Sequence, residues 1–413
     1  MRTRLSAASL AILPVLLIGC GDDGTEPPEP TLRERALAAG LSAMPREPVR
    51  PVENPYLEAR VQLGHLLFFD PILSGPQDVA CSTCHLPSFA FTDGRQFPAG
   101  AGAEGLGPDR TEPGPPPLRP MPRNSPTVLN TGLFGRMDPQ PSINGTMFWG
   151  GSAFGIEDQT LAPLAADNEM RGLSYERMHA QDSVIARVRA IPEYVERFAA
   201  AFPDIHEESG LDPERLIGPT TMRRALAAYV RELITPDAPV DRFLGGDDGA
   251  LTPDEKTGLA LFIGKANCVA CHHGPLLSDF DMHVLGAPQE GIGRDSTPGD
   301  DLGWGEHGGT PYSFRTPPLR QVGLTGPYFH AGTHATLPDV LAFKDRGESA
   351  HPAVPSAALD PEAGPIGLTE VDLARIVDFL HALTDTTTTR SPLFQAPDAV
   401  PSGLQPPHLG GSE

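Results

Sequence analysis

The sequence predicts a mainly α-helical protein of two similar units joined by long irregular loops. Apolar residues recur at helical spacing, most clearly over 222–233 and 373–383. The 47 prolines and 44 glycines among 413 residues require irregular segments between the helices. A short cysteine motif occurs twice, each time after a helical pattern, which indicates a duplicated unit.

The expected helices follow one layout in both units. A helix over 56–69 ends at Asp70-Pro71, and the first cysteine motif follows it. A capping box with proline at the first helical position, over 252–255, opens a second helix that runs to Ile263, just before the second motif. Residues 369–372 cap the last helix in the same way.

Both cysteine motifs have the pattern Cys-x-x-Cys-His. This spacing allows two thiols to add to the vinyl groups of one porphyrin, while the adjoining histidine offers its imidazole to the iron. A zinc ribbon would place its second pair about 15–20 residues after the first, and neither zinc, a redox dithiol nor a disulfide needs the histidine. We expect two cytochrome c-like haem domains, with the cofactors attached at Cys81, Cys84, His85, Cys268, Cys271 and His272.

The N-terminus has the features of an export signal. Arg2 and Arg4 precede an apolar stretch, 10–18, that is too short to span a membrane. The residues LIGC that end at Cys20 resemble a bacterial lipobox, which implies that Cys20 is acylated; an ordinary secretory peptide with a stray cysteine is the alternative. The residue after the acylated cysteine is Gly21 rather than aspartate, and by the usual sorting pattern of lipoproteins this favours the outer membrane. We therefore expect a protein that is lipid-anchored to the outer membrane, on the periplasmic side.

The chain is strongly acidic, with a formal net charge of −22 at pH 7. Such a charge argues against binding to nucleic acid, and it favours solubility or a basic protein partner. The charge alone does not name that partner.

The motifs divide the chain into five expected segments. We expect the last of them to be loosely packed, because it is polar and rich in proline. The segments are a lipoprotein signal peptide, 1–19; a tether and N-terminal extension, 20–55; the first haem domain, 56–240; the second haem domain, 241–385; and a polar, proline-rich tail, 386–413.

Six motifs resemble those of one protein family, and they occur in the order that this family keeps. The family comprises the bacterial dihaem cytochrome c peroxidases and their relatives of the MauG type. The motifs are LGHLLFFDPILSG from Leu63, ACSTCH from Ala80, PRNSPTVLN from Pro122, FWGG from Phe148, ANCVACHHGP from Ala266 and TGPYFHAGTHATL from Thr325.

The resemblance implies a peroxide site at the first haem and an electron-transfer site at the second. His85 and His272 would be the proximal iron ligands, and Trp149 would lie between the haems. Gln159 and Glu169 match polar residues above the first iron. Splitting a peroxide bond needs a base that moves a proton from one oxygen to the other, and a carboxylate whose pKa is raised in an apolar pocket suits that role.

The resemblance also implies a calcium site between the two haem domains. Asn124, Thr325 and Pro327 match the ligands of that site, and oxygen ligands are those that calcium prefers. We therefore expect a bound Ca²⁺. A homodimer is compatible with the resemblance, since peroxidases of the family often dimerise.

The first haem departs from typical peroxidases, whose resting enzyme has a histidine above the iron. No histidine occurs between His85 and His179, and the residues FAFTDGR from Phe89 resemble MauG-like members with an open first haem. Met121 and Met137 are alternative ligands, although a packing role is more typical of either. We expect an iron that is open to peroxide without prior reduction.

The distal ligand of the second haem differs too. Peroxidases of the family place methionine there, and MauG-like members place tyrosine, whereas this sequence has Lys344 at the matching position. A neutral amine can bind iron where burial favours the loss of its proton. Met282, His283 or no residue at all are the alternatives.

Three functions remain open at this point. The first is a peroxidase that reduces hydrogen peroxide to water with electrons from a small cytochrome, a cupredoxin or another donor. The second is a MauG-like enzyme that uses peroxide to oxidise residues of a partner protein at long range. The third is a dihaem electron-transfer cytochrome without catalysis, against which Glu169 and Gln159 argue.

Overall fold

The computed structural model describes residues 29–111, 122–134, 146–161, 180–210, 212–290 and 301–408. Over these residues the chain is mainly helical, which confirms the predicted fold class. None of their helices is long and apolar enough to cross a membrane. The helices are α1 (Leu32–Ala38), α2 (Glu58–Phe69), α3 (Cys81–Cys84), α4 (Ile156–Leu161), α5 (Ala180–Arg189), α6 (Pro192–Ala201), α7 (Pro203–Ser209), α8 (Pro219–Glu232), α9 (Pro239–Leu244), α10 (Pro253–Ile263), α11 (Leu337–Arg346) and α12 (Glu370–His381).

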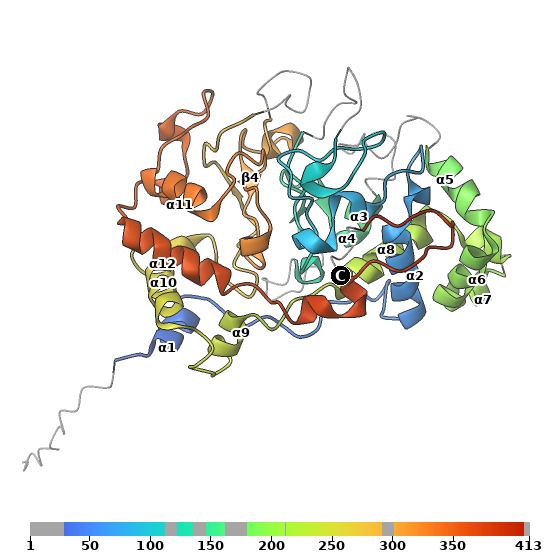
Figure 1. Cartoon of the computed structure of the whole chain (residues 1–413), viewed down its shortest axis with the longest axis horizontal. Helices are drawn as coiled ribbons and strands as arrows, with labels where there is room; N and C mark the ends of the chain where they lie inside the picture. The colour runs from blue at the N-terminus through green and yellow to red at the C-terminus, as the bar shows by residue number, and fades with distance from the viewer. Residues whose placement is uncertain are drawn as a thin grey trace, which may run out of the picture.

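The helices gather in two lobes that lie side by side (Figure 1). The first lobe is the group around α2 and α8, and the second lobe is the group around α10 and α12. Each lobe has a separate cluster of buried apolar side chains. The two cysteine motifs therefore belong to two different hydrophobic cores.

A close crossing of α2 and α8 forms the centre of the first lobe. Gly64 lies at this crossing, because a Cβ atom there would be 1.9 Å from the carbonyl oxygen of Ala225. Around it Leu63, Leu67 and Tyr229 are fully buried. The removal of their apolar surface from water stabilises the contact between the two helices.

The second lobe repeats this crossing with α10 and α12. A Cβ atom at Gly258 would lie 1.9 Å from the carbonyl oxygen of Arg375, and Phe379 lies beside it. Both helices begin with the predicted capping boxes, at Thr252 and at Thr369. The repeated glycine contact supports the predicted duplication of one structural unit.

The N-terminal extension packs against the second lobe, although it precedes the first lobe in the sequence. Ala36 of α1 is fully buried in the second core. The Gly274 amide donates a hydrogen bond to the Gly40 carbonyl at 2.8 Å, and the Met44 amide donates to Asp241 at 2.8 Å. The extension therefore contacts the chain directly after the second cysteine motif.

The C-terminal tail crosses in the opposite direction, from α12 to the first lobe (Figure 1). Phe394 and Val400 are buried in the first core. Ser402 donates a hydrogen bond to Asp70 at 2.7 Å. The expectation of a loosely packed tail is therefore wrong for residues up to 408, because two apolar side chains among the polar ones are enough to fix it.

Strands are few and short in the described part of the chain, and they form two antiparallel pairs. In the first pair Met147 lies opposite Ala153, and in the second His283 lies opposite Phe314. The first pair encloses the FWGG motif, and the second lies beside it in the other lobe. The strands are β1 (Thr146–Met147), β2 (Ala153–Phe154), β3 (Met282–His283) and β4 (Phe314–Arg315).

Candidate haem sites

The first motif forms a single helical turn, α3. The Thr83 hydroxyl accepts a hydrogen bond from the Ala80 amide at 3.0 Å, and the His85 amide closes the turn on the Cys81 carbonyl at 3.0 Å. Cys81 and Cys84 are both half-buried residues. One short segment thus presents two thiols and one imidazole.

The His85 imidazole is oriented by the backbone of the next turn. Its Nδ1 donates to the Phe91 carbonyl at 3.0 Å. With the proton on Nδ1, the opposite nitrogen keeps the lone pair that an iron ligand requires. Burial lowers the pKa of His85, so the ring is neutral at physiological pH, as a metal ligand must be.

The second motif repeats this geometry on a short 3-10 helix, η6 (Cys268–Ala270). The His272 amide donates to the Cys268 carbonyl at 2.9 Å, and Nδ1 of the ring donates to the Leu277 carbonyl at 2.8 Å. Burial lowers the pKa of His272 to about 4. Both motifs therefore hold a neutral imidazole by a carbonyl five or six residues further along the chain.

The thiols of the two motifs are unpaired. Burial raises the pKa of Cys81 and Cys84 to about 12, and that of Cys268 to about 11. A redox-active dithiol needs a lowered thiol pKa, because the thiolate is its nucleophile. The environment of these cysteines therefore argues against a redox dithiol.

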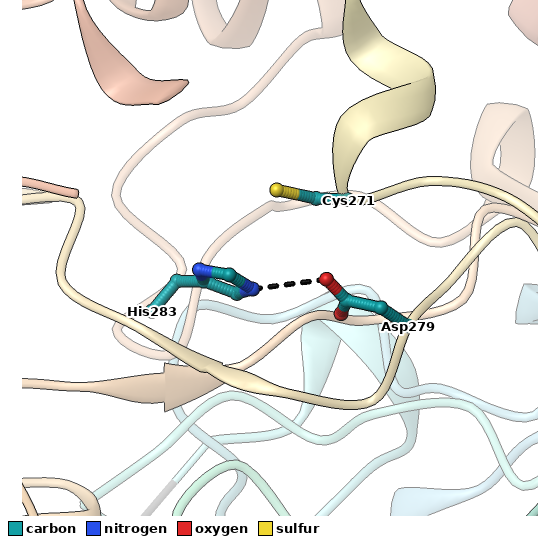
Figure 2. A group of neighbouring side chains, drawn as sticks. All are labelled: Cys271, Asp279 and His283. Carbon is teal, nitrogen blue, oxygen red and sulfur yellow. Dashed lines mark hydrogen bonds and ion pairs between the residues drawn. The ribbon is translucent and has the colours of Figure 1, made fainter. Parts of the chain in front are cut away.

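One group of side chains near the second motif has the composition of a metal site. The ligand atoms of Cys271, Asp279 and His283 lie within 4.8 Å of one another (Figure 2). His283 is bonded on both sides, since Nε2 lies 3.0 Å from Asp279 and Nδ1 contacts Asp360. The bond to Asp279 is the main cause that raises the pKa of His283 to about 11. A protonated imidazole has no lone pair for a metal, so this group is an ion pair.

A cavity with largely apolar walls opens on the second motif. Both thiols and the His272 ring line it. A c-type haem requires two thiols, an imidazole with one free nitrogen and an apolar enclosure, and this cavity provides all of them. Its apolar walls include Phe262, Leu285, Leu319, Val322, Leu341, Ile376 and Leu380.

Lys344 lies in the same cavity. Leu337, Leu341 and Lys344 follow one face of α11, and all three line the cavity. Burial lowers the pKa of Lys344. The alternatives lie less favourably: both ring nitrogens of His283 are bonded, and the methyl group of Met282 packs at Gly151, outside the cavity wall.

Trp149 lies between the two motifs. Its side chain is buried and lines the cavity of the second motif. The indole nitrogen donates to the Asn124 carbonyl at 2.9 Å, and the Arg315 amide donates to the Trp149 carbonyl at 2.9 Å. The next residue after Asn124, Ser125, donates to the Cys84 carbonyl at 2.8 Å. Two hydrogen bonds, one peptide unit and the Ser125 side chain thus connect the indole to the first motif.

The residues expected above the first iron are only partly described. Gln159 lies on α4, and its side-chain oxygen is buried with no hydrogen-bond partner among the described residues. Glu169, Met121 and Met137 lie outside the described residues, as does Cys20. The structure therefore describes one of the two predicted distal residues, and the distal role of both stays a prediction.

The three residues expected to bind calcium all belong to the wall of the cavity. Asn124, Thr325 and Pro327 all line it. The Asn124 amide nitrogen donates to the Arg95 carbonyl at 2.8 Å, which leaves its side-chain oxygen as an acceptor. Residues from both lobes thus line one space.

A buried polar cluster beside this space was not predicted. Arg123 donates two hydrogen bonds of 2.6 Å to Asp301, and both side chains are buried. His330 stacks on Phe314 with ring centroids 3.6 Å apart, and its ring donates to Gln289 at 2.6 Å. Burial lowers the pKa of His330 to about 3. Arg123 and His330 lie within motifs that signal the family, whereas Asp301 has no signal in the sequence.

Two Cys-x-x-Cys-His turns, each with its imidazole fixed by a backbone carbonyl, define a c-type cytochrome with two haems. Residues 58–249 match the family model described as di-haem cytochrome c peroxidase. The chain is 31% identical over 370 residues to the methylamine utilization protein MauG of Methylorubrum extorquens, covering 88% of this chain and 89% of that protein. The chain belongs to the dihaem cytochrome c peroxidase and MauG family, as its motifs predict.

Other comparisons agree with this assignment. The chain is 33% identical over 393 residues to the cytochrome-c peroxidase IdrP1 of Denitromonas iodatirespirans, which covers 89% of this chain and 91% of that protein. A solved MauG-like protein associated with microbial copper homeostasis matches with a TM-score of 0.69 and 29% identity, over 86% of this chain and 97% of that one. The predicted oxidoreductase with two c-type haems is thereby confirmed.

Proposed function

We propose that this protein reduces hydrogen peroxide to water at the first haem, with electrons that reach it through the second haem. Relatives named cytochrome-c peroxidase match most of the chain and support this activity. The observation that carries the proposal is the position of Trp149, buried between the motifs and bonded to both lobes. A division of labour between two haems requires a path of this kind.

Haems held by the two motifs would supply an iron for peroxide in the domain of His85 and an electron-transfer centre in the domain of His272. The chain itself orients both imidazoles through the carbonyls of Phe91 and Leu277. Such bonds make an imidazole a stronger electron donor to its metal. In this proposal Gln159, whose side-chain oxygen is buried, assists at the first iron, and Glu169 moves the proton between the peroxide oxygens.

The test is electron paramagnetic resonance of the oxidised protein before and after one equivalent of hydrogen peroxide. One high-spin and one low-spin haem, whose signals both vanish with peroxide, would support an open first haem that shares its oxidation with the second. Two low-spin signals that ignore peroxide would contradict the proposal. Replacement of Glu169 by glutamine should slow peroxide consumption roughly 10²- to 10⁴-fold, the range for general acid–base groups.

A MauG-like role is the second candidate, in which peroxide serves to oxidise residues of a partner protein. Lys344 favours it, because a cavity without methionine at this position differs from that of the peroxidases. Turnover with a reduced cytochrome or cupredoxin distinguishes the two roles. Rapid multiple turnover would support the peroxidase, whereas peroxide-dependent modification of a partner without such turnover would support the MauG-like role.

Lys344 is, in this proposal, the distal ligand of the second haem. Its place on the cavity wall with His272 and its lowered pKa support the assignment. A buried amine without a proton has a lone pair to offer. The engagement of His283 by two carboxylates removes its main competitor.

We also propose that Asn124, Thr325 and Pro327 hold Ca²⁺ between the lobes. No hydrogen bond between described residues ends on the carbonyl oxygen of Thr325 or of Pro327, so both oxygens are available to a cation. Calcium takes 6–8 oxygen ligands, and water would complete the set. Removal of the metal with a chelator should perturb the spectra of both haems, and readdition of Ca²⁺ should restore them.

The cellular setting follows from the N-terminus and the charge. We propose that Cys20 carries the lipid anchor and that the protein lies on the periplasmic side of the outer membrane. The net charge of −22 favours a basic electron donor or protein substrate. A homodimer would appear as twice the monomer mass in light scattering.

A further inference from the structure

The turn that orients His85 has an unusual backbone. Ala90 and Phe91 have φ angles of 50° and 59°, so two consecutive residues other than glycine occupy the left-handed region. This conformation is uncommon, and for a bulky residue it is a genuine outlier. It persists only where the surrounding structure holds it in place. Phe91 is also the residue whose carbonyl accepts the His85 Nδ1 proton.

Backbone hydrogen bonds close this turn, from the Phe91 amide to the Leu86 carbonyl at 2.8 Å and from the Leu86 amide to the Thr92 carbonyl at 2.9 Å, and packing of the Phe91 ring adds to them. The ring is 1% exposed. On one side it contacts Phe68 of α2, with ring centroids 6.1 Å apart, and on the other it contacts Phe394, also at 6.1 Å and nearly perpendicular. Phe68 in turn lies 6.5 Å from the His85 ring. The C-terminal tail thus supplies one of the two aromatic walls of the turn.

The tail is itself fixed on both sides of Phe394. The Tyr229 hydroxyl donates to the Leu393 carbonyl at 3.1 Å, and the His65 ring donates to the Gln395 carbonyl at 2.8 Å. These bonds come from α8 and α2, the two helices at the centre of the first lobe. Phe394 is therefore held against Phe91 by its own neighbours.

The tail begins in the second lobe with an equally firm contact. Asp385 is buried, and its side chain accepts hydrogen bonds from the amides of Asp237, Thr387 and Thr388. From this point the chain runs to Phe394 in fewer than ten residues. The tail therefore connects the end of α12 in the second lobe with the turn that orients His85 in the first.

We propose that Phe394 is a positioning residue for the axial imidazole of the first haem. It keeps the Ala90-Phe91 turn in its left-handed conformation, and the turn keeps the Phe91 carbonyl on His85 Nδ1. That bond makes the imidazole a stronger donor to the iron. The proposal rests on the assignment of His85 as the axial ligand, which belongs to the proposed function.

The test compares the holoprotein with its Phe394→Ala variant. The readout is the iron–histidine stretching band of the reduced first haem in resonance Raman spectra, together with the reduction potential of that haem. Loss of the ring should shift the band to lower frequency and raise the potential, and peroxide consumption should fall about tenfold, as when a group behind a metal ligand is lost. The signals of the second haem should not change.

Val400→Ala is the matched control, because Val400 is buried in the same tail and the same core. It should lower the free energy of unfolding without shifting the band. Phe394→Leu should restore most of the wild-type band, and Phe394→Val replaces the alanine variant if that one does not fold. A band and potential that are unchanged in Phe394→Ala, or in Phe394→Val where the alanine variant does not fold, would overturn the proposal. A wild-type protein that lacks the band would instead contradict the open first haem. The reduction potential alone would then decide whether Phe394 positions the His85 imidazole.

Discussion

The carbonyl oxygen of Arg375 lies so close to Gly258 that a Cβ atom on this glycine would be 1.9 Å from it. Gly64 and Ala225 have the same relationship in the first lobe, again at 1.9 Å. A contact this short is closed to every residue with a side chain. Each lobe is thus built on one helix crossing at which a glycine is required.

Replacement of Gly258 by alanine should destabilise the second lobe. The added methyl group must push α10 and α12 apart, and overpacking of this kind costs about 1–3 kcal/mol, occasionally more. Urea unfolding of the holoprotein measures the loss. Gly218→Ala is the control, since a Cβ atom there meets no atom within 4 Å, and it should change the free energy of unfolding by less than about 1 kcal/mol. Equal effects of the two substitutions would contradict the required glycine.

Replacement of Trp149 by phenylalanine should uncouple the haems. The indole and its bond to the Asn124 carbonyl are lost, while the ring volume is largely kept. Peroxide consumption with a reduced donor should fall roughly 10- to 100-fold, the range for loss of a group around a metal centre. Trp304→Phe is the matched control. Trp304 is the second of the two tryptophans in the sequence, and it packs at Gly151, in the FWGG motif that also contains Trp149. If both variants equilibrate their haems like the wild type, Trp149 is not the path.

Replacement of Asp93 by asparagine should stabilise the protein above pH 6. Asp93 is 1% exposed, and burial raises its pKa to about 6. The folded protein therefore binds more protons than the unfolded chain between about pH 4 and pH 6, so stability falls as the pH rises through this window. The cost above pH 6 is about 3 kcal/mol at most, from a shift of roughly two pKa units.

Chemical unfolding between pH 4 and pH 7 measures this effect. The Arg95 amide donates a hydrogen bond to Asp93 at 3.1 Å, and the side-chain amide of the D93N variant still offers an oxygen to that donor. The variant should match the wild type at pH 4 and exceed it at pH 7. The exposed Asp109, replaced by asparagine, should show no such difference. A wild-type stability that does not fall between pH 4 and pH 6 relative to D93N would exclude the raised pKa.

Replacement of Cys20 by serine should release the protein from the membrane. Acylation at Cys20 requires the thiol, and stable anchoring requires more than one acyl chain. Fractionation of cells should move the variant from the membrane to the soluble periplasmic fraction with both haems attached. A wild-type protein that is already soluble would contradict the anchor, and it would indicate an ordinary secretory signal.

Much of this architecture could be predicted because its signals are local. The haem motifs are defined by a spacing of a few residues, and the capping boxes at Thr252 and Thr369 by a spacing of three. The apolar faces of the helices could be predicted from residues within one helical turn of each other. These features depend on neighbours in the sequence, which the chain displays directly.

The exchange of the chain ends could not be predicted in this way. Ala36 precedes the first lobe in the sequence but packs in the second core, and Phe394 follows the second lobe but packs in the first core. The polar, proline-rich composition of the tail gives no indication that Phe394 is buried. The pairing of Arg123 with Asp301 likewise joins two segments that are 178 residues apart.

Replacement of Lys344 should test whether its amine is the distal ligand of the second haem. The neutral amine is the form that binds, so coordination is lost as the pH falls and Lys344 takes up a proton. Burial lowers the pKa of Lys344 in the folded protein. The unfolded chain therefore binds more protons than the folded protein does, and the free energy of unfolding rises with pH. In the wild type we expect a low-spin second haem that becomes high-spin on acidification. Lys344→Ala should be high-spin at every pH, and Lys344→Met should be low-spin without this transition, because a thioether does not take up a proton.

Lys265→Met, at an exposed ion pair with Asp372, should behave as the wild type. If the spin-state transition of the wild type persists in Lys344→Met, another group takes up the proton, and Lys344 is not the distal ligand of the iron.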